Sequence, residues 1–183
     1  AGENMGGGGK ADGEQSVAAV WGKIWPASLG VAGVFWISLA LFPALTVRIP
    51  PSSPDPQGWM PVVLITLFNL GDLAGRLLAG FSPELLSAGL LAGLCAARLA
   101  FLPLFLFLQS AASFGGMHDG AAAAAVLAMA TTSGYAASAL LVRGQLQARA
   151  GGARETASTL LSFAMTTGLA LGAVSAVPLA NLL

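Results

Sequence analysis

Five apolar stretches, each long enough to form a helix across a bilayer, constrain this chain more than any other feature of its sequence. A helix rises about 1.5 Å per residue, so about 20 apolar residues cross a hydrocarbon core ~30 Å thick. Strands that span a membrane are about half as long and alternate in polarity. The sequence therefore predicts an all-α membrane protein with five transmembrane helices, at about residues 25–47, 59–80, 85–108, 121–142 and 156–179.

The composition agrees with this class and argues against others. Of the 183 residues, 56% are hydrophobic and only 9% are charged, whereas a soluble domain carries about 25% charged residues. The formal net charge is zero and the basic residues are scattered, so we expect no nucleic-acid partner. One cysteine and one histidine argue against an internal disulfide framework and a cysteine- or histidine-rich metal site, and no cofactor is expected.

The chain divides into two predicted parts. Residues 1–20 are rich in glycine and form a predicted cytoplasmic linker or tail, and residues 21–183 form the transmembrane bundle. The chain begins with alanine, and we expect it to be a fragment of a longer protein. With the N-terminus inside, Arg48 is the basic residue left outside, against five inside: Lys10, Lys23, Arg143, Arg149 and Arg154. This bias predicts a cytoplasmic N-terminus and an external C-terminus.

Charged side chains inside the predicted spans point to function. Asp72 and Arg76 fall in the second span and Arg98 in the third. Each costs at least ~2.5–3.5 kcal/mol at the bilayer centre, so each should face protein or water. At about 100° per residue, Asn69, Asp72 and Arg76 lie within about 60° of one another on the helix surface. This stripe offers donors and acceptors that suit ligand hydroxyls and the edges of heterocycles.

Several alternatives remain open from the residues alone. Asp72 and Arg76 are four residues apart and could neutralise each other as an intrahelical pair. Arg98 could reach the stripe or bind helix carbonyls, and the structural role is favoured. The surplus positive charge allows a transporter of small organic anions, and the stripe could instead dock the helix of a partner protein. An enzyme is disfavoured, because Asp72 is the one carboxylate in a span and His118 falls in a loop.

Two softer features concern helix shape and packing. Gly168 and Gly172 have the small-xxx-small spacing that allows close helix approach. Pro43 and Pro103 lie within apolar runs, where they remove backbone hydrogen bonds and are expected to kink their helices.

The second span carries a recognisable motif. Residues 68–76, Phe-Asn-Leu-Gly-Asp-Leu-Ala-Gly-Arg, resemble the F-N-x-x-D-x-x-G-R signature of the equilibrative nucleoside transporter family. Other segments resemble that family in the right order: residues 34–46 with their F-P-A-x-T ending, 97–103, 133–138, and 155–157 followed by 168–173. The resemblance covers nearly everything after the N-terminal tail.

The resemblance implies the C-terminal part of an eleven-helix transporter with a fold like the major facilitator superfamily. Its expected partners are a nucleoside, or in some cases a nucleobase, the lipid bilayer and a missing N-terminal bundle of six helices. Alternating access would move the substrate, and this chain alone is expected to be inactive. A plasma membrane is the expected location, with an organelle membrane as the alternative.

The resemblance also assigns roles to individual positions. In the family, residues matching Asp72 and Arg76 contact the nucleoside, chiefly its sugar, and the positions of Asn69 and Pro43 lie near the outer gate. The residue at Ile65 is aromatic in some relatives. We therefore expect Asn69, Asp72 and Arg76 to bind substrate. Gate or structural roles are expected for four others: Pro43, Ile65, Phe68 and Arg98.

Overall fold

The computed structural model of the chain describes residues 16–52, 55, 58–81, 87–113, 119–149 and 153–181. Within these ranges every regular element is a helix, in the order α1 (Val17–Leu41), η1 (Thr46–Arg48), α2 (Trp59–Phe81), α3 (Ala88–Ala97), η2 (Arg98–Ala100), α4 (Phe101–Ser113), α5 (Asp119–Arg149) and α6 (Arg154–Asn181). Five segments are long and apolar enough to cross a membrane, and α3, η2 and α4 together make one of them. The predicted all-α membrane protein with five spans is confirmed.

The first helix differs from its predicted bounds at both ends. It begins at Val17 rather than near residue 25, because the Ser16 side chain caps it by accepting a hydrogen bond from the amide of Ala19. Residues 17–20 are therefore helical, and residues 1–15 of the predicted tail lie outside the described residues. The helix ends at Leu41 because the residue before a proline disfavours helical backbone, and Phe42, which precedes Pro43, is extended.

The third span is interrupted where Arg98 lies. A short 3₁₀ segment, η2, separates α3 from α4. Pro103 has no backbone N–H to donate to the carbonyl of Leu99, so a regular helix cannot continue through this turn.

The fourth predicted span, which is helix α5, is longer than hydropathy predicts. It continues to Arg149, seven residues past the predicted end at 142. Arginine and glutamine in this extension are good helix formers, whereas the prediction followed apolar residues alone.

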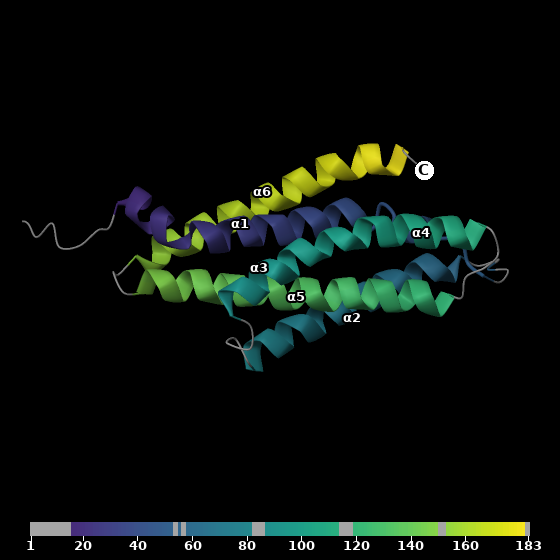
Figure 1. Cartoon of the computed structure of the whole chain (residues 1–183), viewed down its shortest axis with the longest axis horizontal. Coiled ribbons are helices and arrows are strands. Elements are labelled where there is room, and N and C mark those ends of the chain that lie inside the picture. The colour runs from purple at the N-terminus through teal and green to yellow at the C-terminus, as the bar shows by residue number, and fades with distance from the viewer. Residues whose placement is uncertain are drawn as a thin grey trace, which may run out of the picture.

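Helices α1 and α5 lie in the middle of the bundle. The most extensive contacts join α2 to α5 and α6 to α1, followed by α1 to α5. Figure 1 shows α6 (yellow) beside α1 (purple), and α1 begins and α6 ends at opposite ends of the bundle, as an odd number of spans requires.

Glycines allow two of these contacts to be very close. A Cβ atom added at Gly134 of α5 would lie 2.0 Å from the Asp72 carbonyl oxygen, and one at Gly168 of α6 would lie 2.3 Å from the Ala32 carbonyl oxygen. At Gly172 an added Cβ would lie 2.8 Å from the backbone of α1, so the small-xxx-small spacing marks a helix contact, as predicted.

The interior has two apolar clusters with a polar layer between them. One cluster includes Ile24, Val34 and Leu161, and the other includes Leu64 and Phe105. Three buried polar residues lie between these clusters along α1, η2 and α5: Ser38, Arg98 and Ser133.

Candidate functional site

Side chains from α1, α2, α5 and α6 surround a cavity of about 160 Å³ near the middle of the spans. Its lining is formed by Phe35, Ser38, Leu39, Phe42, Phe68, Asp72, Arg76, Ser133 and Leu169. Pockets that hold a whole drug-sized ligand measure ~300–1,000 Å³. The cavity formed by the described residues therefore has room for only part of such a ligand.

Asp72 and Arg76 form the charged part of this cavity. The Arg76 Nε donates to Asp72 Oδ2 at 2.6 Å, one helical turn apart, so the intrahelical pair considered from the sequence is present. The pair is still accessible, since 41% of the Arg76 side chain and 22% of the Asp72 side chain are exposed. Both residues line the cavity, so pairing with each other does not remove them from it.

This geometry leaves hydrogen-bonding capacity unused. Within the described part of the chain, Asp72 Oδ1 and the two terminal nitrogens of Arg76 make no hydrogen bond. A guanidinium holds five N–H groups, and the bond from Nε uses one. The pair therefore keeps one carboxylate oxygen and four N–H donors for a ligand, while its net charge is zero.

Asn69 does not join this pair in the cavity. Its side chain is exposed, and Nδ2 donates to the Ile65 carbonyl oxygen of its own helix at 2.9 Å. Ile65 is also exposed on α2. The predicted stripe is thus divided, with Asp72 and Arg76 lining the cavity and Asn69 outside its lining.

Phe68 forms an aromatic wall of the cavity. Its ring stacks on Phe42 with centroids 3.9 Å apart and ring planes 7° apart. The stack joins α2 to the chain just after α1, and Pro43, which is exposed, follows directly. Of the predicted gate residues, Phe68 thus stacks on the residue that precedes Pro43, whereas Ile65 lies on an exposed part of α2.

Arg98 lies outside the cavity lining and is almost fully buried, with 1% exposed. Its Nη1 donates to the Met129 carbonyl oxygen and to Thr132 Oγ1, both at 2.9 Å. Its Nη2 donates to Ser38 Oγ at 2.7 Å. Arg98 thus joins η2 to α1 and α5 inside the bundle.

The structure adds two residues to the cavity that sequence reasoning did not assign to a site. Ser38 and Ser133 both line it, and their hydroxyl oxygens are 2.8 Å apart. The signal available in the sequence was a serine at the middle of an apolar span, where a hydroxyl needs a partner.

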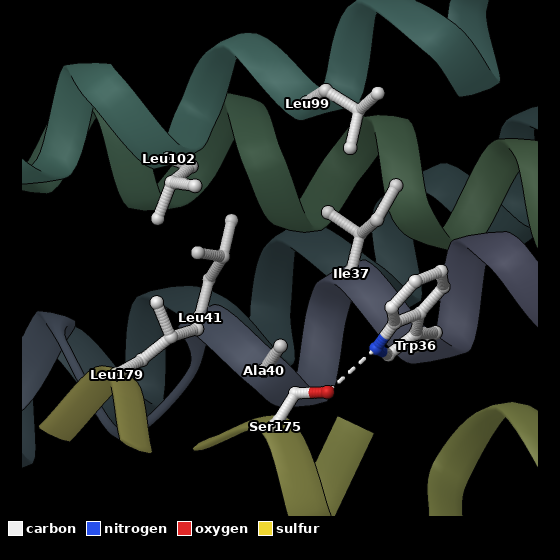
Figure 2. Close-up of a pocket in the computed structure, with 8 residues that line it drawn as sticks. All are labelled: Trp36, Ile37, Ala40, Leu41, Leu99, Leu102, Ser175 and Leu179. Atoms are coloured by element: carbon white, nitrogen blue, oxygen red, sulfur yellow. Dashed lines mark hydrogen bonds between the residues drawn. The ribbon is translucent and has the colours of Figure 1, made fainter. Parts of the chain in front are cut away.

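A second cavity lacks such chemistry. It has a volume of about 150 Å³ and lies between α1, α6 and the η2–α4 segment (Figure 2). Among its lining residues, Trp36 donates from Nε1 to Ser175 Oγ at 2.9 Å, and the others are apolar: Ile37, Ala40, Leu41, Leu99, Leu102 and Leu179. No charged side chain is among its described lining residues, so of these two cavities the first has the groups for a polar ligand.

Comparison with known proteins agrees with the motif in α2. The sequence model of the nucleoside transporter family matches residues 8–180. The chain is 31% identical to equilibrative nucleoside transporter 2 of Mus musculus over 171 residues, and 32% identical to equilibrative nucleoside transporter 1 of the same species over 174 residues. These alignments cover 88% and 87% of this chain and 37% of each relative. Equilibrative nucleoside transporter 4 of Danio rerio is 30% identical, over 84% of this chain and 29% of the relative. The chain spans well under half the length of these relatives, and it belongs to the nucleoside transporter family.

Proposed function

We propose that the full-length protein moves nucleosides across a membrane by alternating access, and that this chain supplies its C-terminal helices. The observation that carries the proposal is the Asp72–Arg76 pair, which lines a cavity in the middle of a membrane span with donors and acceptors unused. Ionisable residues inside a membrane mark substrate pathways more often than they serve packing alone. The names of the relatives support a nucleoside as the substrate.

The charges around the cavity favour a neutral solute over an anion. Asp72 and Arg76 cancel each other, and the extra positive charge sits on Arg98. Arg98 is buried outside the cavity lining, and both of its terminal nitrogens already donate to protein oxygens. A ligand in the cavity therefore meets a neutral pair with many hydrogen-bonding atoms, which suits the hydroxyls and ring edges of a nucleoside.

The same site implies that more of the protein is needed for transport. The cavity is smaller than a complete ligand pocket and is open, so we propose that a second helical bundle completes its walls and rocks against this one. The proposed orientation has the N-terminus inside and the C-terminus outside. We expect the chain expressed alone to show no saturable nucleoside uptake, in contrast to the full-length protein.

Uptake of labelled uridine by cells that lack endogenous nucleoside transport tests this function. In the full-length protein, Asp72→Asn and Arg76→Leu should each lower uptake at least about tenfold, because each removes a charge-assisted contact worth ~1.5–3 kcal/mol. Thr66→Ala is the matched control, since this exposed α2 hydroxyl bonds only the Val62 carbonyl of its own helix in the described structure. Surface expression is measured for every variant.

The outcomes separate the alternatives. Normal uptake by both variants would refute the site assignment. Absence of saturable uridine uptake, together with stable co-purification of a membrane partner, would favour a docking subunit instead. Stronger competition by small organic anions than by unlabelled nucleosides would favour an anion transporter.

A further inference from the structure

Ser38, Arg98 and Ser133 form a continuous hydrogen-bonded layer behind the cavity. They come from α1, η2 and α5, and their exposed fractions are 8%, 1% and 4%. Arg98 bonds Ser38, and Ser38 bonds Ser133. The two serines line the cavity, and Arg98 lies behind them.

The direction of each hydrogen bond in this layer follows from the number of protons available. A carbonyl oxygen can only accept, so the single hydroxyl proton of Ser38 goes to the Val34 carbonyl oxygen, at 2.6 Å. A guanidinium can only donate, so Ser38 Oγ accepts from Arg98 Nη2. Having no second proton, Ser38 must also accept in its 2.8 Å contact with Ser133. Ser133 is therefore the donor of that bond.

This assignment decides what Ser133 offers to the cavity. Its one proton is used within the layer, and in the described part of the chain no group donates to its oxygen. Ser133 Oγ thus keeps lone pairs as acceptors, and donating a hydrogen bond makes an oxygen a better acceptor. The next residue, Gly134, packs against the Asp72 backbone so closely that an added Cβ would lie 2.0 Å from its carbonyl oxygen. Ser133 and Asp72 therefore lie at the same depth in the membrane.

We propose that Ser133 is a second substrate contact, which accepts a hydrogen bond from a donor group of the ligand. Ser38 is a positioning residue, because its own proton goes to the Val34 carbonyl and its oxygen accepts the Ser133 proton, while Arg98 holds that oxygen in place. This inference rests on the proposed transport function and extends it. With Asp72 Oδ1, the cavity presents two acceptors at one depth, which fits a ligand bearing two donor groups, such as a sugar diol or a hydroxyl and a ring N–H.

The test compares ligands that each lack one donor. In the full-length protein and in Ser133→Ala, the inhibition constants against labelled uridine uptake are measured for uridine, 2′-deoxyuridine, 3′-deoxyuridine, 5′-deoxyuridine and 3-methyluridine. We expect one of the four analogues to bind about fivefold to tenfold more weakly than uridine because it lacks the Ser133 contact. In Ser133→Ala that analogue should bind about as well as uridine, while the inhibition constants of the other three analogues relative to uridine stay unchanged. Ser133→Thr keeps a hydroxyl and should retain the weaker binding of that analogue. Thr131→Ala is the control, since that α5 hydroxyl bonds the Leu127 carbonyl of its own helix.

A second variant tests the direction of the layer. Ser38→Ala removes the oxygen to which Ser133 donates, so the Ser133 proton becomes free to point into the cavity. A deoxyfluoro analogue can accept but not donate, and it should gain affinity relative to the matching deoxy analogue in this variant. A merely structural role of Ser38 would leave the affinity of the deoxyfluoro analogue relative to the deoxy analogue unchanged.

The results are decisive in each direction. If Ser133→Ala weakens uridine and every analogue by the same factor, or changes no ratio, the Ser133 contact is wrong while transport itself stands. If the affinity of the deoxyfluoro analogue relative to the deoxy analogue is the same in Ser38→Ala as in the unsubstituted protein, the positioning role of Ser38 is wrong. If the unsubstituted full-length protein takes up no uridine, the proposed function fails and the inference with it.

Discussion

Replacing Gly75 by alanine tests the close crossing of α2 and α5 that places Asp72 beside Ser133. A Cβ atom at Gly75 would lie 2.1 Å from the Thr131 carbonyl oxygen and 2.7 Å from the Tyr135 amide nitrogen, whereas ordinary contact begins at 3.4 Å. Both atoms belong to the backbone of α5, so no side-chain rotation relieves the clash. The two helices must separate by about 1 Å, because packed interiors transmit strain rather than absorb it.

The magnitude follows from two opposing terms. Overpacking costs about 1–3 kcal/mol, and alanine regains roughly 0.5–1 kcal/mol over glycine in a helix. We expect a net loss of roughly 0–2.5 kcal/mol, centred at about 1 kcal/mol, which lowers the melting temperature by up to about 10 °C for a chain of this size. A displacement of about 1 Å at Asp72 should also reduce uridine uptake by up to ~10²-fold.

The assay is thermal unfolding of detergent-purified protein, followed by the fraction that remains monodisperse after heating. Gly80→Ala is the matched control, because Gly80 lies in the same helix and an added Cβ there meets nothing within 4 Å. The control should melt at or slightly above the wild-type temperature. If Gly75→Ala melts as high as Gly80→Ala, the argument from close packing is refuted.

Three further predictions concern a buried hydroxyl, a hydrogen bond between helices and a ring stack. Thr46 is fully buried, and its hydroxyl has no hydrogen-bond partner in the described part of the chain. Because an unpaired buried polar group costs about 1–3 kcal/mol, Thr46→Val should raise the melting temperature. A lower melting temperature would show that the hydroxyl is bonded. Trp36→Phe and Ser175→Ala should each cost about 0.5–1.5 kcal/mol in thermal unfolding, and the double variant no more than the worse single one, whereas additive losses would contradict their hydrogen bond. Phe68→Leu removes a ring stack worth about 0.5–1.5 kcal/mol and should raise the KM for uridine uptake with surface expression retained; an unchanged KM would contradict its place in the cavity wall.

Asn69 shows the limit of reading a binding site from one helix. A helical wheel gives the direction of a side chain about its own axis, and by that measure Asn69 belongs with Asp72 and Arg76. The wheel does not say where neighbouring helices lie or whether a short amide will bond its own backbone. Asn69 does bond its own backbone, and the neighbours that form the cavity meet Asp72 and Arg76 instead.

Arg98 and Ser38 show the same limit between helices. The expense of burying a guanidinium indicated that Arg98 must have partners. Those partners, Met129, Thr132 and Ser38, are between 31 and 60 residues away along the chain. Hydropathy marked Ser38 as one weakly polar residue in an apolar span, and its position between Arg98 and the cavity arises from the packing of α1 against η2 and α5.

The amino-acid sequence was enough to predict five helices long and apolar enough to cross a membrane, because the thickness of a bilayer and its exclusion of unpaired backbone groups act on each segment separately. It also determined that an acid and a guanidinium lie one turn apart inside a span, since that depends only on spacing along one helix. Which polar groups share a cavity, and which serine hydroxyls line it, followed instead from the tertiary structure. Those properties depend on the rotation and separation of helices, which are set by contacts between residues far apart in the chain.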